Sequence, residues 1–383
     1  MNKKLKLGVI GGGINSAVGQ THFIATSMGF GSEIVSGFFS RDEDQNKRTG
    51  DRFGIPLQKQ YGSLDSFILG EKNQVDLVIV LTPTDGHYET LVKLLSSGFD
   101  VICEKSLVLN AGEAKEIQGI IKKNKNFLSV IYNYTGYAMV REMREIIASR
   151  DLGEILSFSI NMPQQSYIKT NEKGETSQPQ AWRLNEKSKV PHVSLDLGIH
   201  VVNLIDFLFS KNTEYVFAQQ RSYGKFEGVI DFVQSTVCLE DEIVGNVCYG
   251  KSFLGEDNGL EIKIYGTKGS MNWCHSSSES IKLCDENGAI SIITSSSQNL
   301  KEANKKRYHR FKPGHPTGFI EAFSNHYDDI FRAFLNDKTH NEFSFCIEDA
   351  IRDLQLLEMM TDSSNRNEVC IKKPFEVVNK NVG

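Results

Sequence analysis

The alternation of apolar strands and amphipathic helices over the first 132 residues restricts this part of the chain to very few folds. Strands are predicted at residues 5–10, 34–39, 75–81, 101–103 and 127–131. Helices are predicted at residues 41–53, 63–70, 85–97 and 111–124. Because strands that alternate with helices pair in parallel through right-handed crossovers, we expect a parallel sheet covered on both faces.

The pattern changes after residue 132. Helices are predicted at residues 137–149, 195–209, 317–335 and 346–361, and strands at 155–161 and repeatedly between 214 and 294. Short strands separated by Gly, Asn and Asp turns favour a largely antiparallel sheet. A length of 383 residues favours two domains. We therefore predict an α/β protein with a dinucleotide-binding domain at 1–132 and a substrate-binding domain at 133–383, whose C-terminal helix can pack back on the first.

Composition excludes several classes of partner. The net charge of −5 gives no reason to expect nucleic acid or an acidic membrane. No two of the seven cysteines form a CxxC pair, and none has a His/Cys spacing typical of a metal site. This favours free thiols in a reducing cytoplasm, and we expect no metal site. The apolar run 5–10 is too short for a signal peptide or a membrane span.

A glycine-rich turn follows the first strand. Gly11, Gly12 and Gly13 lead into a predicted helix, the context in which glycines admit a pyrophosphate to the helix N-terminus. The spacing is irregular, because residue 16 is Ser and the next candidate glycine is Gly19; three inserted residues would explain this. The contacts expected from this loop come from Gly11, Gly13, Ile14 and Gly19.

The ends of the next two strands supply further candidates for cofactor binding. Ser40 and Arg41 follow the second strand and suit a 2′-phosphate, which favours NADP, whereas Asp42 could still reach a ribose of NAD. The choice between NAD and NADP stays open. After the third strand, Thr82-Pro83 forms a turn beneath the cofactor, and His87 either contacts the cofactor or is a structural residue at a helix start.

Three residues can form a site that handles protons. Lys105 ends the apolar run 101–103, and Asp196 precedes His200 by four residues on a predicted helix. Glu104 should point to the other side of its strand, where we expect it to support the cofactor. Taken singly, His200 is more often a residue of the core, and Asp196 could be a helix N-cap. Together with Lys105 and the glycine-rich turn, the two residues indicate hydride transfer.

These motifs resemble the glucose-fructose oxidoreductase / inositol dehydrogenase (Gfo/Idh/MocA) superfamily. The resemblance rests on the glycine-rich loop, Thr82-Pro83 with His87, and the segments VICEKS and LDLGIHVVNL. The segments at 132–155, QAWR at 180–183 and GHPTGFIEAF at 314–323 are similar to a bacterial subgroup acting on sugars or glycosides.

The resemblance implies a Rossmann domain, an α/β domain with an open antiparallel sheet, and a homo-oligomer, a dimer or a tetramer. It also implies that Lys105, Asp196 and His200 are catalytic. Two departures stand out: Ser106 replaces the usual proline, which relaxes the backbone of Lys105, and the segment 189–194 replaces a glycine-rich approach to Asp196.

Residue chemistry assigns the roles. His200 has a suitable unperturbed pKa of about 6.5 for a base, and Asp196 could orient or charge-stabilise it. Lys105 can stabilise a developing alkoxide by polarising the hydroxyl, or it can share the proton relay. Tyr134, Trp182 and Arg183 are candidate sugar contacts, because aromatic faces stack on pyranose rings and arginine bridges hydroxyls. His315 is a further pocket candidate. Trp182 could equally be a buried residue of the core, and His315 could equally be part of a turn that leads into a helix.

The predicted activity is hydride transfer between a secondary alcohol of a sugar or glycoside and NAD or NADP. Ring C3 is a candidate position for the alcohol, and the cofactor can stay tightly bound. One alternative is a glycosidase of the same fold that uses NAD for transient oxidation. The other is a sugar sensor without catalysis, which the presence of Lys105, Asp196 and His200 disfavours.

Overall fold

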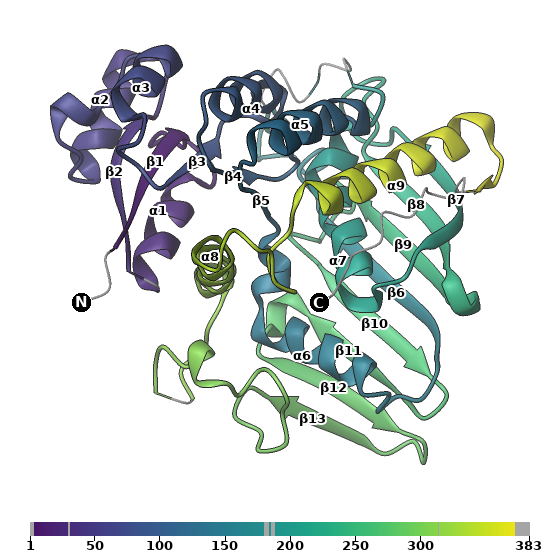
Figure 1. Cartoon of the computed structure of the whole chain (residues 1–383). Coiled ribbons are helices and arrows are strands. Elements are labelled where there is room, and N and C mark those ends of the chain that lie inside the picture. The colour runs from purple at the N-terminus through teal and green to yellow at the C-terminus, as the bar shows by residue number, and fades with distance from the viewer. Residues whose placement is uncertain (1–3, 30, 180–183, 185–187, 313, 372–383) are drawn as a thin grey trace.

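The N-terminal part of the chain forms a five-stranded sheet with every strand parallel, in the order β2-β1-β3-β4-β5 (Figure 1). The computed structural model describes residues 4–29, 31–179, 184, 188–312 and 314–371. The elements of this part are β1 (Leu5–Gly11), α1 (Gly19–Met28), β2 (Ser32–Phe38), α2 (Glu43–Arg52), α3 (Leu64–Glu71), β3 (Leu77–Leu81), α4 (His87–Ser96), β4 (Val101–Glu104), α5 (Ala111–Asn124) and β5 (Leu128–Ile131). Strand β3 is buried throughout, as expected when helices cover both faces.

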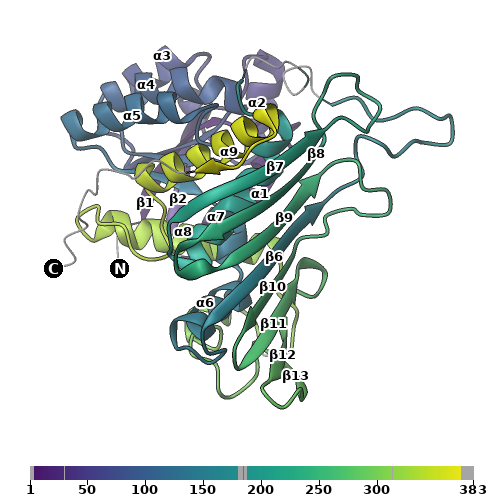
Figure 2. The same ribbon diagram turned by 90° about the vertical axis from the view of Figure 1, so that its right-hand side faces the viewer.

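The rest of the chain forms a nine-stranded sheet in the order β13-β12-β11-β10-β6-β9-β8-β7-β14. Its pairs are antiparallel except β6 with β9, which is parallel. The elements are α6 (Ala138–Ala148), β6 (Ile155–Pro163), α7 (Ile199–Phe209), β7 (Thr213–Arg221), β8 (Phe232–Leu239), β9 (Val244–Gly250), β10 (Glu261–Gly266), β11 (Gly269–Cys274), β12 (Ser280–Asp285), β13 (Ile290–Thr294), α8 (Phe319–Leu335), α9 (Ile347–Arg366) and β14 (Cys370–Ile371). Figure 2 shows α6 and α7 behind this sheet, with the opposite face towards the viewer.

One predicted helix differs at its start. The chain over 195–209 was expected to be a single α-helix, but Ser194–Gly198 forms a wider, π-helical turn before α7 begins. Asp196 therefore lies within the wide turn, whereas His200 lies in the first turn of α7.

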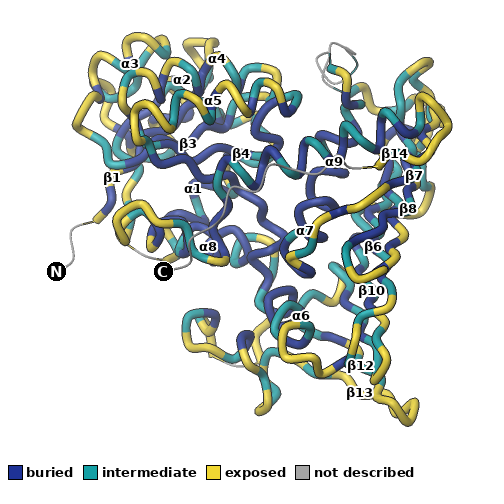
Figure 3. The backbone as a smooth tube through the Cα atoms, turned by 45° about the vertical axis from the view of Figure 1, so that its right-hand side comes forward, coloured by how far each residue is buried: buried dark blue, intermediate teal, exposed yellow. Residues whose placement is uncertain are grey.

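Both long C-terminal helices pack against the N-terminal part of the chain. Helix α8 contributes Phe323, Tyr327 and Phe331 to the same apolar cluster as Val9 of β1 and Phe23 of α1. Helix α9 packs on α5, where the Glu358 carboxylate accepts a hydrogen bond from the Ala111 amide at 2.8 Å. Figure 3 shows buried backbone running continuously from the parallel sheet into α7 and α9.

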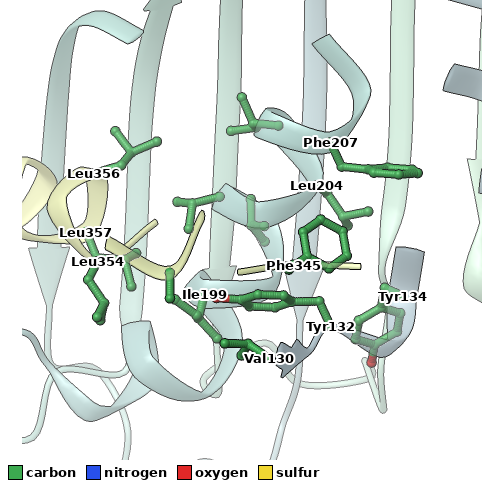
Figure 4. Packing of buried hydrophobic residues seen from close by; sticks show 14 of the residues in the cluster. Val130, Tyr132, Tyr134, Ile199, Leu204, Phe207, Phe345, Leu354, Leu356 and Leu357 are labelled. Atoms are coloured by element: carbon green, nitrogen blue, oxygen red, sulfur yellow. The ribbon is translucent and has the colours of Figure 1, made fainter. Parts of the chain in front are cut away.

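A second cluster joins the two sheets. Residues from β5, α7 and α9 pack together, and Figure 4 shows Val130 and Tyr132 beside Ile199, with Phe345 and Leu354 close by. Because this interface is large and apolar, it restricts motion of one domain relative to the other. The ends of the parallel strands are therefore held against the turn that precedes α7.

Within the described ranges, no helix combines the length and apolar character that crossing a membrane requires. Among the same residues, no group of three or more His, Cys, Asp or Glu side chains could hold a metal ion.

Replacing Phe331 by Ala should lower the free energy of unfolding by about 3–5 kcal/mol, because Phe331 is fully buried where α8 packs on the parallel sheet. Chemical denaturation followed by circular dichroism measures the loss. The matched control is Leu335→Ala on the same helix, where the side chain is 54% exposed and the expected change is within about 0.5 kcal/mol. Equal effects from the two variants would contradict the packing of α8 described here.

Candidate active site

The glycine-rich turn has the backbone of a dinucleotide-binding loop. Gly11 and Gly12 have φ values of +85° and +69°, a region that glycine adopts without strain. A Cβ atom on Gly11 would lie 2.7 Å from the backbone of Leu81 and Thr82, at the end of the neighbouring strand β3. The loop therefore lies against the carboxyl end of the sheet, where parallel α/β sheets bind ligands.

The irregular spacing of this loop is accommodated by a local turn. The Ser16 amide donates to the Gly13 carbonyl at 2.7 Å, and the Ser16 hydroxyl accepts from the Gly19 amide at 3.1 Å. Helix α1 begins at Gly19, where a Cβ atom would lie 2.3 Å from the Gly12 carbonyl oxygen. Gly19 thus occupies the place of the third glycine, which lets the helix approach the loop. The Ile14 amide donates to the Thr49 hydroxyl at 3.1 Å, so this predicted cofactor contact is already used within the protein.

The segment after β2 is organised by hydrogen bonds around the start of α2. The Asp42 carboxylate caps α2 by accepting from the Gln45 amide at 2.8 Å, and the Ser40 hydroxyl accepts from the Asp42 amide at 3.1 Å. Arg41 is exposed beside them. An N-cap carboxylate keeps part of its accepting capacity, so both a ribose hydroxyl at Asp42 and a 2′-phosphate at Arg41 remain compatible with this end of the sheet.

The residues after β3 divide into two groups. Among the described residues, the Thr82 hydroxyl is buried without a hydrogen-bond partner, so it is able to bind a ligand. Pro83 is exposed. His87 is buried, with Nδ1 2.9 Å from the Ser106 carbonyl oxygen and Nε2 2.7 Å from the Thr82 carbonyl oxygen. Burial lowers the pKa of His87. Since both ring nitrogens face the backbone, His87 positions the segment after Lys105 instead of offering a polar atom to a cofactor.

Glu104 and Lys105 point to different partners. The Glu104 carboxylate lies 3.1 Å from Nε2 of His22 on α1, and Nδ1 of His22 lies 2.8 Å from the Tyr327 hydroxyl on α8. Glu104 is therefore a structural link between β4, the cofactor helix and the C-terminal part of the chain. The peptide bond between Lys105 and Ser106 is cis, and Ser106 is buried.

Lys105 and Asp196 form the ion pair at the centre of the site. The Lys105 ammonium donates to the Asp196 backbone carbonyl at 2.8 Å and to Oδ1 at 3.0 Å. A second ammonium, that of Lys251, donates to Oδ2 at 2.5 Å. The carboxylate is thus shared by two lysines that come from opposite sides, one following β4 and the other following β9.

His200 lies beside this pair but is not bound to it. No hydrogen bond joins Asp196 to His200 in the part of the chain that the structure describes, where Nδ1 of His200 is buried without a partner, so Asp196 acts on His200 through its charge. The pKa of His200 is lowered well below 6.5, first by burial and then by the charge of Lys105, with the charge of Asp196 acting in the opposite direction. His200 is therefore neutral at pH 7 and able to accept a proton.

Tyr134 contacts His200, and a polar network extends from it. The two rings meet edge to face, with centroids 4.7 Å apart. The Tyr134 hydroxyl accepts from the Asn258 amide at 3.0 Å, and His275, 3.4 Å from that amide, lies 2.8 Å from the Tyr137 hydroxyl. These neutral donors and acceptors suit the hydroxyl groups of a sugar.

Sequence reasoning missed Lys251, Asn258 and His275. Each lies in or beside a strand of the large sheet with no motif around it, and only the fold brings them to the site. Among the predicted sugar contacts, Tyr134 is at the site, whereas His315 is exposed in a turn. Trp182 and Arg183 lie outside the described residues.

Two family models match the chain in succession. Residues 5–132 match the model described as the NAD-binding Rossmann fold of an oxidoreductase family. Residues 144–371 match the C-terminal alpha/beta domain of the same family. These matches confirm the predicted α/β fold class and the nicotinamide cofactor.

Individual relatives agree with this assignment. An uncharacterized oxidoreductase of Bacillus subtilis (strain 168) is 26% identical over 280 residues, or 71% of each chain. Glucose-6-phosphate 3-dehydrogenase of the same organism is 25% identical over 289 residues, which cover 73% of this chain and 77% of that protein. The crystal structure of an inositol dehydrogenase homolog from Azotobacter vinelandii, complexed with NADH and myo-inositol, superimposes with a TM-score of 0.87 at 21% identity and covers 97% of this chain and 98% of that one. At that identity it supports the fold.

Gly19→Ala should weaken the binding of NADH, because the added Cβ collides with the Gly12 carbonyl oxygen and opens the loop. Titration followed by NADH fluorescence measures the loss, expected at about 10-fold or more in Kd for a clash of this kind. Gly62→Ala is the matched control, since nothing lies within 4 Å of a Cβ there. Unchanged binding by Gly19→Ala would contradict the role of this loop.

Proposed function

We propose that this chain, which belongs to the Gfo/Idh/MocA oxidoreductase family, is a dehydrogenase that oxidises a secondary alcohol of a sugar or glycoside with NAD or NADP. The observation that carries the proposal is the meeting of Lys105, Asp196 and His200 at the carboxyl end of the parallel sheet. The relative named glucose-6-phosphate 3-dehydrogenase supports a polyhydroxylated substrate. Its name also supports ring C3 as the position oxidised.

The residues at the carboxyl end of the sheet fit a nicotinamide cofactor. The glycine loop, the unpartnered Thr82 hydroxyl and the segment 40–42 would hold it. Bound there, the cofactor supplies the hydride acceptor. Arg41 supports a preference for the 2′-phosphate of NADP, while the capping geometry of Asp42 still admits NAD.

Lys105 would bind and polarise the reacting oxygen. An ammonium has three N–H donors, and Lys105 directs two interactions at Asp196. A third N–H is available to the substrate hydroxyl, where it stabilises the alkoxide character that develops as the hydride leaves. The Asp196 carboxylate keeps the ammonium in this orientation.

His200 would receive the proton of the hydroxyl group. Its ring is buried, neutral and next to Lys105, so it can act as a general base without first losing a proton to water. Tyr134 packs its ring edge to face with that of His200 and thereby limits the orientations of the imidazole. Asn258 and His275 extend the site with hydrogen-bonding groups for other hydroxyls of the substrate.

Purified protein mixed with NAD or NADP and a panel of hexoses, polyols and glycosides should give an absorbance increase at 340 nm with at least one pair. Lys105→Met should lower kcat by about 10²-fold or more, because the group that stabilises the alkoxide is lost. Lys93→Met is the control, since Lys93 forms an exposed pair with Asp65.

The same assay separates the alternatives. A glycosidase would retain bound NAD and release a free leaving group without net reduction of cofactor. A sensor would bind sugar with no absorbance change. Absence of cofactor reduction with every sugar, together with an unaffected Lys105→Met variant, would contradict the proposal.

The rate of oxidation should stay nearly constant as the pH falls through 6.5, because the lowered pKa of His200 keeps this base neutral there. An ordinary histidine, with a pKa of about 6.5, would lose activity about 10-fold per pH unit below that value. The measurement is kcat/KM between pH 8 and 5, with the folded fraction followed by circular dichroism at each pH. A midpoint at 6.5 that disappears in His200→Asn would show that His200 titrates normally.

A further inference from the structure

We propose that Lys251 is a positioning residue that holds the Asp196 carboxylate against Lys105, an inference that rests on the proposed dehydrogenase function. The Lys251 ammonium donates to Oδ2 of Asp196 at 2.5 Å, while Lys105 takes Oδ1 at 3.0 Å. Since each lysine uses a different oxygen, the two contacts together determine the plane of the carboxylate. One contact alone would leave the group free to rotate about its Cβ–Cγ bond.

The position of Lys251 is defined by its backbone on both sides. It follows β9 directly, and its amide donates to the Asp231 carbonyl at 2.8 Å, while its own carbonyl accepts from the Tyr167 amide at 2.9 Å. The ammonium lies 5.0 Å from the centroid of the Tyr167 ring, within the range of a cation–π contact. Lys251 thus enters the site from a rigid part of the large sheet.

Burial makes this lysine unusual. Its side chain is only 6% exposed, against 17% for Lys105. A buried ammonium is costly unless it is paired, and the carboxylate with which it pairs is the one that Lys105 uses. Among the described residues, two ammonium groups meet at one carboxylate, and this local excess of positive charge favours an alkoxide next to them.

Lys251 also helps to orient the Asp196 carboxylate towards Lys105 and not towards His200. His200 follows Asp196 by four residues, and Nδ1 of its imidazole is buried with no hydrogen-bond partner among the described residues. The carboxylate nevertheless faces the two lysines. Removing Lys251 takes away its donor at Oδ2, which loosens the hold on the carboxylate beside Lys105.

The first test measures turnover. Lys251→Met should lower kcat by about 10²-fold, the loss expected when a reacting group is displaced by about 1 Å, with the substrate KM and the Kd of NADH changed by less than about 2-fold. Lys251→Arg should recover most of kcat, because it restores a cation at Oδ2. The matched control is Lys59→Met, which removes a lysine from its pair with the buried Glu71 in the other domain. If Lys251→Met does not fold, Lys251→Gln takes its place.

The second test does not depend on turnover. Acetylation by acetic anhydride, followed by mass spectrometry, measures how fast each lysine is modified. Lys105 should react about 5-fold faster in Lys251→Met, the factor that corresponds to loss of one modest interaction, and at the wild-type rate in Lys251→Arg and Lys59→Met.

The two tests separate the two proposals. Unchanged modification of Lys105 in Lys251→Met would overturn the positioning role, and so would a kcat loss that Lys251→Arg fails to recover. Faster modification in a protein that reduces no cofactor with any sugar would support the positioning role and contradict the dehydrogenase function.

Discussion

The apolar core shared by the parallel sheet, α7 and α9 is the constraint on which the rest of the structure depends. Val130 and Tyr132 of the first domain pack in the same cluster as Ile199, Leu204 and Leu354 of the second (Figure 4). This core holds the end of β4 against the turn before α7, so that a lysine from one domain and an aspartate from the other lie 3.0 Å apart. A smaller or more polar interface would let the domains move and the pair separate.

Around this core, some buried polar groups form internal contacts, and others belong to the site. Glu104 contacts His22, and His87 faces two backbone carbonyls, so both act as internal supports. Lys105 lies at the domain boundary with capacity to act on a substrate, and its charge lowers the pKa of His200. Because an unpaired polar group inside a protein is costly, the Thr82 hydroxyl and Nδ1 of His200, which are buried without a hydrogen-bond partner among the described residues, draw attention to the ligand site.

Sequence reasoning was most successful where the signal is local. The α/β class followed from periodicity and the expectation of two domains from chain length. Gly19, the residue predicted as third glycine despite three inserted residues, lies where an added Cβ would meet the Gly12 carbonyl oxygen. It expected one α-helix over 195–209, whereas the chain forms a π-helical turn at Ser194–Gly198, and Asp196 acts on His200 through its charge without a hydrogen bond among the described residues. It also left His87 between two roles, since only its partners show which of them applies.

By itself, the sequence determined the alternation of strands and helices, the cofactor loop and the types of residue available for proton transfer. Those properties depend on residues that are neighbours along the chain. The tertiary structure decided which charges meet. Lys105 is 91 residues from Asp196, and Lys251 is 55 residues beyond it. Nothing local identifies Lys251, because a lysine at a strand end is normally solvated; it becomes part of the site only because the large sheet folds back over the turn before α7.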